Sequence, residues 1–158
     1  MKKGFTLIEV MISIVIFSLL ITLMSNVVTS LNISIITLNK EYNKQLKNSY
    51  LIKTLYGDIL NSSKIILENN NKNYSIIYIQ TSNSLYNNPF SYVVWYVSKK
   101  QNSLMRLESE NFMKLPVNME NKFELDKFKN NIKIFKIYKK NNKYFIFIKD
   151  KKNLFFEI

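Results

Sequence analysis

A chain of 158 residues can hold one folded domain and an N-terminal anchor, and this one carries 23 basic against 11 acidic side chains, a formal net charge of +12. The absence of cysteine and histidine excludes disulfide bonds, thiolate metal sites and the catalytic constellations built on those residues. The sequence has no glycine-rich phosphate loop, and beyond Ile132 it holds only two acids, Asp150 and Glu157, too few for a clustered calcium site. The composition therefore predicts a protein that is not an enzyme and has no cofactor.

The first two dozen residues contain an apolar stretch, Phe5–Met24, in which Glu9 is the only charge. Twenty residues of helix rise about 30 Å, the thickness of the hydrocarbon core of a bilayer, so the stretch predicts a membrane span. Lys2 and Lys3 precede it, and the positive-inside rule predicts a cytoplasmic N-terminus with the remainder outside, in the periplasm of a cell with two membranes. A carboxylate within a span costs about 2.5–3.5 kcal/mol, so Glu9 requires a partner or a function.

Three interpretations of this N-terminus compete. A cleaved secretory signal peptide would have an apolar region of about 7–15 residues and a small-x-small cleavage site, and the sequence shows neither. A plain signal anchor explains every feature except Gly4 and Glu9. The third interpretation takes Lys2–Val10 together, because the order of basic residues, glycine, aromatic residue, apolar residues and glutamate resembles the class III signal of type IV pilins and of the pseudopilins of type II secretion.

This resemblance implies that a prepilin peptidase cuts after Gly4 and that Phe5, the new N-terminal residue, is methylated. It implies an assembly role for Glu9, whose carboxylate would pair with the cationic N-terminus of a neighbouring subunit and so offset the desolvation of both charges. A carboxylate that reaches the membrane surface is the alternative for Glu9. The implied partners are the peptidase, the inner membrane, and other pilins or pseudopilins that pack through their N-terminal helices. The implied domains are a leader (1–4), a transmembrane or filament-core helix (5–26) and an exported pilin-like domain (27–158).

Beyond the span, the sequence predicts that the helix continues to about residue 68, since no proline interrupts it and apolar residues recur at helical spacing. We expect a bend or a close contact with a strand at Gly57. β-branched and aromatic residues then predict six strands: Tyr74–Gln80, Tyr92–Ser98, Ser103–Glu108, Ile132–Lys139, Lys143–Lys149 and Asn153–Ile158. The expected connections are hairpin turns at 140–142 and 150–152 and a short helix at 120–128.

The expected fold class is therefore α+β and pilin-like, with the long N-terminal helix packed on antiparallel β-sheet. Tyr92–Val97 and Tyr144–Ile148 carry apolar residues on both faces, which predicts either strands covered on two sides or a contact between subunits. The hairpin Tyr92–Glu108, aromatic-rich and then Leu-x-Arg, resembles the paired strands of the minor pseudopilin called J and of W-type minor pilins. That resemblance implies a minor subunit that initiates or joins a filament. We expect Glu108 and Glu110 on a solvated strand edge.

Basic residues dominate the exported part, with 21 lysines and arginines against 10 acids from residue 40 onward. Lysines alternate with aromatic residues in the last predicted strands, as they do on surfaces that hold a nucleic-acid backbone and stack bases. Solvated turns are the alternative for these lysines. A DNA-binding competence pilin is thus a second functional hypothesis, and its candidate contacts are Lys136, Tyr138, Lys140, Lys143 and Tyr144.

Overall fold

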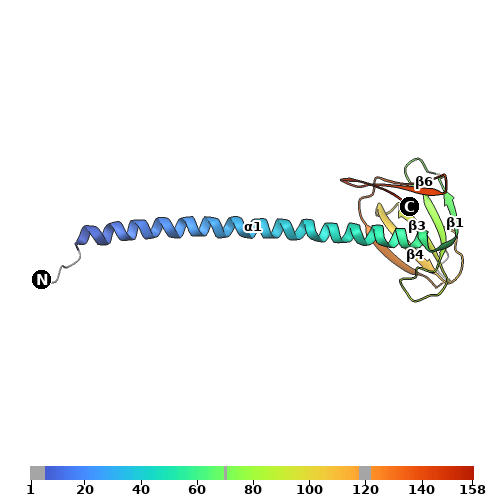
Figure 1. Cartoon of the computed structure of the whole chain (residues 1–158), viewed down its shortest axis with the longest axis horizontal. Coiled ribbons are helices and arrows are strands. Elements are labelled where there is room, and N and C mark those ends of the chain that lie inside the picture. Colours follow the sequence, from blue (N-terminus) through green and yellow to red (C-terminus); the bar gives the residue numbers. More distant parts are fainter. Residues whose placement is uncertain (1–5, 70, 118–121) are drawn as a thin grey trace. The chain divides into compact units, whose positions relative to one another are not determined.

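The computed structural model describes residues 6–69, 71–117 and 122–158, and these residues form one helix and eight strands (Figure 1). The helix, α1 (Leu7–Leu60), precedes a five-stranded and a three-stranded antiparallel sheet. The chain divides into two compact units, Met1–Leu46 and Lys47–Ile158. The predicted fold class, a long apolar N-terminal helix packed on antiparallel β-sheets, is confirmed.

The part of α1 between Leu7 and Ile36 is rich in apolar side chains, and Glu9 is its one charged residue. Its large hydrophobic side chains between Leu7 and Ile36 are each 46–81% exposed. An 18-residue window of the helix has a mean hydropathy of 2.6, so the helix is long and apolar enough to cross a membrane. A helix that is hydrophobic all round requires lipid or other apolar helices around it.

Several hydroxyl side chains along this helix donate hydrogen bonds to carbonyl groups of the helix itself. Ser13 Oγ donates to the Glu9 carbonyl at 2.7 Å, Thr22 Oγ1 to the Ser18 carbonyl at 2.9 Å, and Thr29 Oγ1 to the Ser25 carbonyl at 2.9 Å. Because lipid offers no hydrogen-bond partner, bonds back to carbonyls four residues earlier allow serine and threonine to face an apolar environment.

The helix ends at Leu60, so the predicted extension to about residue 68 is wrong. The Asn61 amide and side-chain Nδ2 both donate to the Gly57 carbonyl, at 3.1 and 2.9 Å, and Ser62 Oγ donates to the Ile59 carbonyl at 2.6 Å. These bonds satisfy the last helical carbonyls. The residues that follow form β1 (Ser62–Glu68), which pairs with the next strand. Its β-branched residues fit the apolar helical pattern but suit a strand at the edge of a sheet equally well, so the pattern did not mark the end of the helix.

The five-stranded sheet has strands in chain order, each antiparallel to its neighbours. Its members after β1 are β2 (Ile76–Thr81), β3 (Ser91–Ser98), β4 (Ser103–Ser109) and β5 (Glu124–Lys129). Strand β5 lies where a short helix was predicted at 120–128, so that prediction is wrong for the described residues. Residues 120 and 121 lie outside the described part. Pairing of Leu125 with Leu107 and of Asp126 with Arg106 places this segment in the sheet despite its weak strand propensity.

The three-stranded sheet has the order β6 (Ile134–Lys140), β7 (Lys143–Lys149) and β8 (Asn153–Glu157). Asn141 and Asn142 connect the first pair with φ of 50° and 61°, the left-handed values that a tight hairpin requires and asparagine tolerates. In the second turn, Asp150 Oδ1 accepts a hydrogen bond from the Lys152 amide at 2.8 Å. Both predicted hairpins are confirmed, and all six predicted strands are present with ends within two residues of the expected positions.

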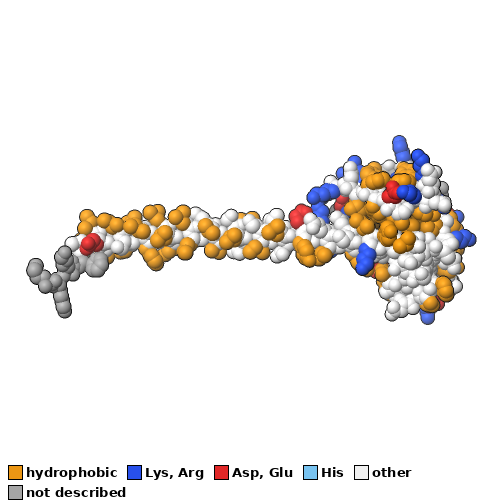
Figure 2. All heavy atoms as spheres, in the orientation of Figure 1, with side chains coloured by type: hydrophobic (Ala, Val, Ile, Leu, Met, Phe, Trp, Pro, Cys, Tyr) orange, Lys and Arg blue, Asp and Glu red, His pale blue; other side chains and the backbone are white. Residues whose placement is uncertain are grey.

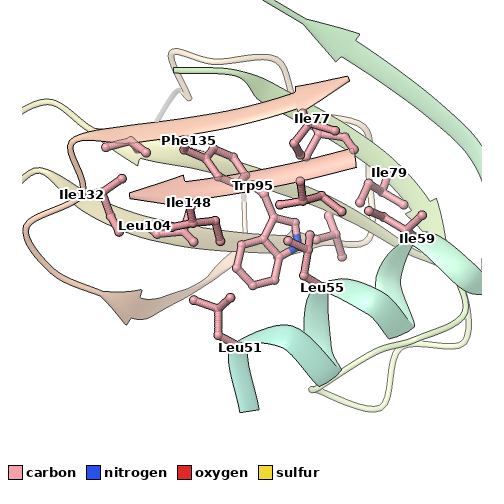
Figure 3. Close-up of a cluster of buried hydrophobic side chains, with 14 residues drawn as sticks. Leu51, Leu55, Ile59, Ile77, Ile79, Trp95, Leu104, Ile132, Phe135 and Ile148 are labelled. Atoms are coloured by element: carbon pink, nitrogen blue, oxygen red, sulfur yellow. The ribbon is translucent and has the colours of Figure 1, made fainter. Parts of the chain in front are cut away.

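The main core lies between the two sheets and the last turns of α1. Figure 3 shows Leu51 and Leu55 of the helix near Trp95 and Ile59 near Ile79, with Phe135 and Ile148 on the strands beyond. Each fully buried side chain of this size stabilises the fold by about 1.5–3 kcal/mol. A second cluster, Tyr78, Val94, Leu107 and Met113, covers the opposite face of the five-stranded sheet. Strand β3 is therefore covered on both sides, as one of the two interpretations of Tyr92–Val97 predicted.

Gly57 permits a close approach between α1 and the β2–β3 connection. A Cβ atom at this position would lie 2.8 Å from Asn83 Nδ2, which is too close for any other residue without displacement of Asn83. The close contact at Gly57 is with a loop side chain, whereas a bend or a contact with a strand was expected. The same Asn83 nitrogen donates to Asp58 at 2.8 Å, so the glycine makes room for a polar contact beneath the helix.

Candidate functional site

The N-terminal signal is the first candidate site. In its described part, Thr6 and Glu9 form hydrogen bonds with each other. The predicted cleavage and methylation residues, Gly4 and Phe5, lie outside the described residues. Glu9 Oε2 accepts hydrogen bonds from the Thr6 amide at 2.9 Å and from Thr6 Oγ1 at 3.0 Å, and the Glu9 amide donates to Thr6 Oγ1 at 3.4 Å. This reciprocal arrangement is a capping box, in which the third residue of the helix and the cap satisfy each other's donors.

The capping box gives Glu9 a local role that the sequence analysis missed. The spacing Thr6-x-x-Glu9 ahead of an apolar run is the known sequence pattern of a capping box, so the signal was present in the sequence. A carboxylate close to the helix N-terminus also interacts favourably with the helix dipole. Glu9 is therefore an acceptor held in place by Thr6 within one chain.

A buried cluster of charges is the second candidate site. Asp58 stands in the last turn of α1, and Arg106 and Glu108 lie two residues apart on β4, so they share the core face of the sheet. Arg106 Nε lies 2.9 Å from Asp58 Oδ2, and Arg106 Nη1 lies 2.5 Å from Glu108 Oε2. All three side chains have 0% exposure, so solvent and substrate cannot reach them.

Every member of this cluster has several hydrogen-bond partners. Asp58 accepts from Arg106 Nε and Nη2, from Trp95 Nε1 at 2.7 Å and from Asn83 Nδ2. Glu108 accepts from the Ser91 hydroxyl at 2.8 Å, the Leu85 amide at 3.1 Å and the Ser84 hydroxyl. The prediction of a solvated strand edge is therefore wrong for Glu108. Sequence alone could not pair the three charges, since Asp58 and Arg106 are 48 residues apart.

Burial and hydrogen bonding act in opposite directions on the two carboxyl groups. Burial raises the pKa of Asp58 above its ordinary value, although hydrogen bonds from Arg106, Trp95 and Asn83 oppose that rise. For Glu108, burial would also raise the pKa, but the hydrogen bonds from Ser84, Arg106, the Leu85 amide and Ser91 outweigh it, and the pKa of Glu108 is lowered. The cluster is thus a structural ion network that ties the helix end, β4 and the β2–β3 loop together.

The five candidate nucleic-acid contacts do not share one face. Lys136, Tyr138, Lys140 and Lys143 stand on the face of the three-stranded sheet that points away from the core. Tyr144 lies on the opposite face, packed against the core and covered by Lys139 Nζ, 5.4 Å from its ring centroid. The sequence analysis missed Phe145, which pairs with Tyr138 across the hairpin and lies on the same face. Side chains alternate between the two faces of a strand, and a two-residue turn fixes which residues pair across the hairpin. The sequence could therefore have shown that Phe145 shares a face with Tyr138.

Within residues 6–69, 71–117 and 122–158, no three acidic side chains gather as ligands for a metal ion. A pocket of about 200 Å³ opens on the face of β1–β3 that points away from the helix, and aromatic rings of Tyr78, Tyr92 and Phe112 line it. Its rim carries Lys64 and Gln80, without a nucleophile and base in contact. The pocket offers apolar contact area and no catalytic chemistry.

Replacing Arg106 by methionine is expected to lower the free energy of unfolding by about 3–5 kcal/mol, because Asp58 and Glu108 would remain buried without their cation. Denaturant unfolding of the protein followed by Trp95 fluorescence measures this change. Lys100→Met, in the exposed β3–β4 turn, is the matched control and should change stability by less than about 0.5 kcal/mol. Equal effects of the two substitutions would contradict a central role for the ion network.

The stabilisation contributed by Glu108 should depend on pH in the direction set by its lowered pKa. The contribution is fully present above the unfolded pKa of about 4.3 and is lost as pH falls through the lower folded pKa. The difference in unfolding free energy between the wild type and Glu108→Gln should therefore be constant from pH 7 to about pH 5 and shrink below about pH 4. A difference that grows on acidification would contradict this account.

Comparison with known proteins identifies the N-terminal signal. Residues 1–25 match the family described as the prokaryotic N-terminal methylation motif. Neither a curated protein nor a solved structure matches the chain. The match covers the capping box and most of the apolar span, and it indicates a substrate of prepilin peptidase. The N-terminus thus carries the class III signal, and this match over residues 1–25 supports the resemblance to type IV pilins and pseudopilins.

Proposed function

We propose that the protein is a minor pilin or pseudopilin, a structural subunit that initiates or joins a filament of the type IV pilus or type II secretion kind. The observation that carries this proposal is the methylation motif at the head of a helix whose first 40 residues bury no hydrophobic side chain in their own chain. Such a helix is stable in a bilayer before assembly and in a bundle of like helices afterwards, the two environments that a filament subunit occupies.

The proposed topology follows from the same segment. Residues 1–4 form a cytoplasmic leader that the peptidase removes, residues 5–26 cross the inner membrane once, and residues 27–158 form the exported domain. Lys2 and Lys3 support this orientation through the positive-inside rule. After extraction from the membrane, the same apolar helix would pack against the helices of neighbouring subunits.

Glu9 is proposed to act twice. In the membrane, its carboxylate accepts the two hydrogen bonds from Thr6, which lowers the cost of placing a charge near the end of the span. In the filament, it would pair with the methylated amine of Phe5 on a neighbouring subunit, since the amine remains cationic. The capping box holds the carboxylate at the helix end, where an incoming N-terminus meets it.

The assignment to a minor subunit draws support from the β3–β4 hairpin. The aromatic-rich strand and the Leu-x-Arg strand are paired, with Trp95 directly opposite Arg106 and both side chains bound to Asp58. These are the residues on which the resemblance to the J-type pseudopilin and the W-type pilins rests. We propose that the protein belongs to the initiating group of minor subunits and not to the repeating shaft.

The mature protein should begin at Phe5 with a methylated α-amine, and mass spectrometry of the purified protein detects both changes. Gly4→Leu should leave the precursor uncut because the peptidase requires a small residue before the bond. Gly4→Ala, the matched control, should be processed. A mature protein that still begins at Met1 in cells that contain the peptidase would exclude the proposed function.

Substitutions at Glu9 separate its two proposed roles. Glu9→Ala and Glu9→Gln should both be inserted and cleaved, and both should reduce incorporation into filaments strongly, because loss of one member of a desolvated pair costs about 3–5 kcal/mol. Glutamine keeps an acceptor for the Thr6 bonds, whereas Thr6→Val removes the hydroxyl and keeps the charge. Quantification of the subunit in sheared filaments gives the result. Normal incorporation of Glu9→Gln would show that the cap suffices and that no charge pair forms.

Deletion of the gene should abolish or sharply reduce filaments although each filament contains only a few copies of the protein. The physical reason is that a nucleus of minor subunits must form before the shaft can grow on it. Electron microscopy of the deletion strain and quantitative mass spectrometry of wild-type filaments test this expectation. If this chain is the most abundant subunit along the fibre, the assignment to a minor subunit is wrong.

A further inference from the structure

The outer face of the three-stranded sheet carries an aromatic platform that the core does not use. Its members are the four rings Tyr138, Phe145, Phe147 and Phe155, which we call the aromatic platform. Tyr138 pairs with Phe145, and Phe147 with Phe155, so all four point to the same side. The neighbouring positions Phe135, Ile137, Ile146 and Ile148 point to the opposite side and are buried in the core.

The aromatic platform is partly exposed to solvent. Phe155 is 65% exposed and Tyr138 54%, while Phe145 and Phe147 are half-buried. The rings of Phe145 and Phe155 lie 6.3 Å apart with their planes 18° from parallel, so they form a stacked pair on the surface. A phenylalanine that is 65% exposed does not gain the free energy that burial of its ring would contribute. Its exposure therefore points to a ligand with apolar planar surfaces.

Lysines surround the aromatic platform on the same face. Lys136, Lys140, Lys143 and Lys149 occupy outward positions of β6 and β7. Glu157, the acid on this face, is paired with Lys143 at 2.5 Å. Asp150, in the turn beside the platform, is paired with Lys129 at 3.2 Å. Figure 2 shows hydrophobic surface next to basic side chains on the exported domain. The face therefore presents aromatic rings within a positive field.

We propose that the aromatic platform binds single-stranded nucleic acid, with bases stacked on the rings and phosphates beside the lysines. Rings alone would suit any apolar partner and lysines alone any polyanion, but the presence of both on one face of the sheet fits a polymer with both planar bases and a charged backbone. A duplex has its bases already stacked and would gain only the electrostatic contribution. This activity does not depend on whether the protein is a minor or a major filament subunit.

The test measures fluorescence anisotropy of a labelled 12-nucleotide oligothymidine with the full-length protein in a zwitterionic detergent. The single strand is expected to bind at least tenfold more tightly than a 12-base-pair duplex. The double variant Tyr138→Ser/Phe155→Ser should weaken binding at least tenfold through loss of stacking. Phe90→Ser is the matched control, since Phe90 is 72% exposed but lies in the β2–β3 loop, and it should change affinity less than twofold.

The salt dependence tests the lysines separately. Lys140→Gln should make the slope of log affinity against log salt concentration shallower by about 0.7, the value for one phosphate contact on a single strand. Lys100→Gln, in the exposed β3–β4 turn, should leave the slope unchanged. An oligouridine of the same length distinguishes RNA from DNA as the source of the ligand, and equal affinity for both would also support the proposal because rings and phosphates are common to them.

Three results would overturn the proposal. The first is no binding of the single strand at 50 mM salt. The second is equal affinity for single strand and duplex that the double variant does not change, which would show a charge effect alone. The third is loss of self-association or of a partner subunit in the double variant with unchanged nucleic-acid binding, which would make the platform a protein interface. Thermal unfolding of each variant shows whether the fold is intact, which is expected because the replaced side chains are exposed.

Discussion

The compact unit Lys47–Ile158 depends on one buried cation, the guanidinium of Arg106. Its planar fork reaches Asp58 at the end of α1 through two nitrogens and Glu108 on its own strand through the third. Through Asp58 it also shares a partner with Trp95, the largest side chain of the core. A buried ion network is weak evidence for stability in itself, because desolvation of three charges opposes their attraction. The network instead fixes the position of β4 against the end of α1, because only one register satisfies all of its hydrogen-bond donors and acceptors.

That geometry extends to the β2–β3 loop. Ser84 and the Leu85 amide donate to Glu108, and Asn83 donates to Asp58, so the loop is closed over the network by its own polar groups. Tyr86, further along the loop, donates to Asp126 of β5 at 2.7 Å, and this bond raises the pKa of Tyr86 to about 12. The helix approaches the loop at Gly57, where Asn83 occupies the space of a side chain. The large apolar side chains of this loop, Leu85, Tyr86 and Phe90, are exposed, so charge and hydrogen bonds hold the loop in place of hydrophobic contacts.

The two ends of α1 differ in how far their side chains are buried. Its first part has no buried side chain, whereas Leu51, Leu55 and Ile59 near its end are almost fully buried. The change follows from what surrounds the helix. The last turns find two sheets of their own chain, and the first turns need lipid or the helices of other subunits. Several hydroxyl side chains and the Thr6–Glu9 capping box form hydrogen bonds within the helix, which suits a segment that lies in an apolar environment.

The sequence by itself determined the elements that local physics controls. The apolar run, the class III signal, the six strands and the Asn141–Asn142 turn were all predicted, because hydropathy, residue order, side-chain period and backbone preference act over short distances. The tertiary structure decided the rest. Residues 62–68 form a strand and not helix because β2 offers a pairing partner, and 124–129 form a strand because β4 does. Glu108 is buried and not solvated because it pairs with Arg106, which also binds Asp58. No local pattern in the chain relates Asp58 to Arg106, which are 48 positions apart. Which of the C-terminal aromatics share a face was fixed by the register of β6, β7 and β8, since a shift of one residue would reverse every side chain.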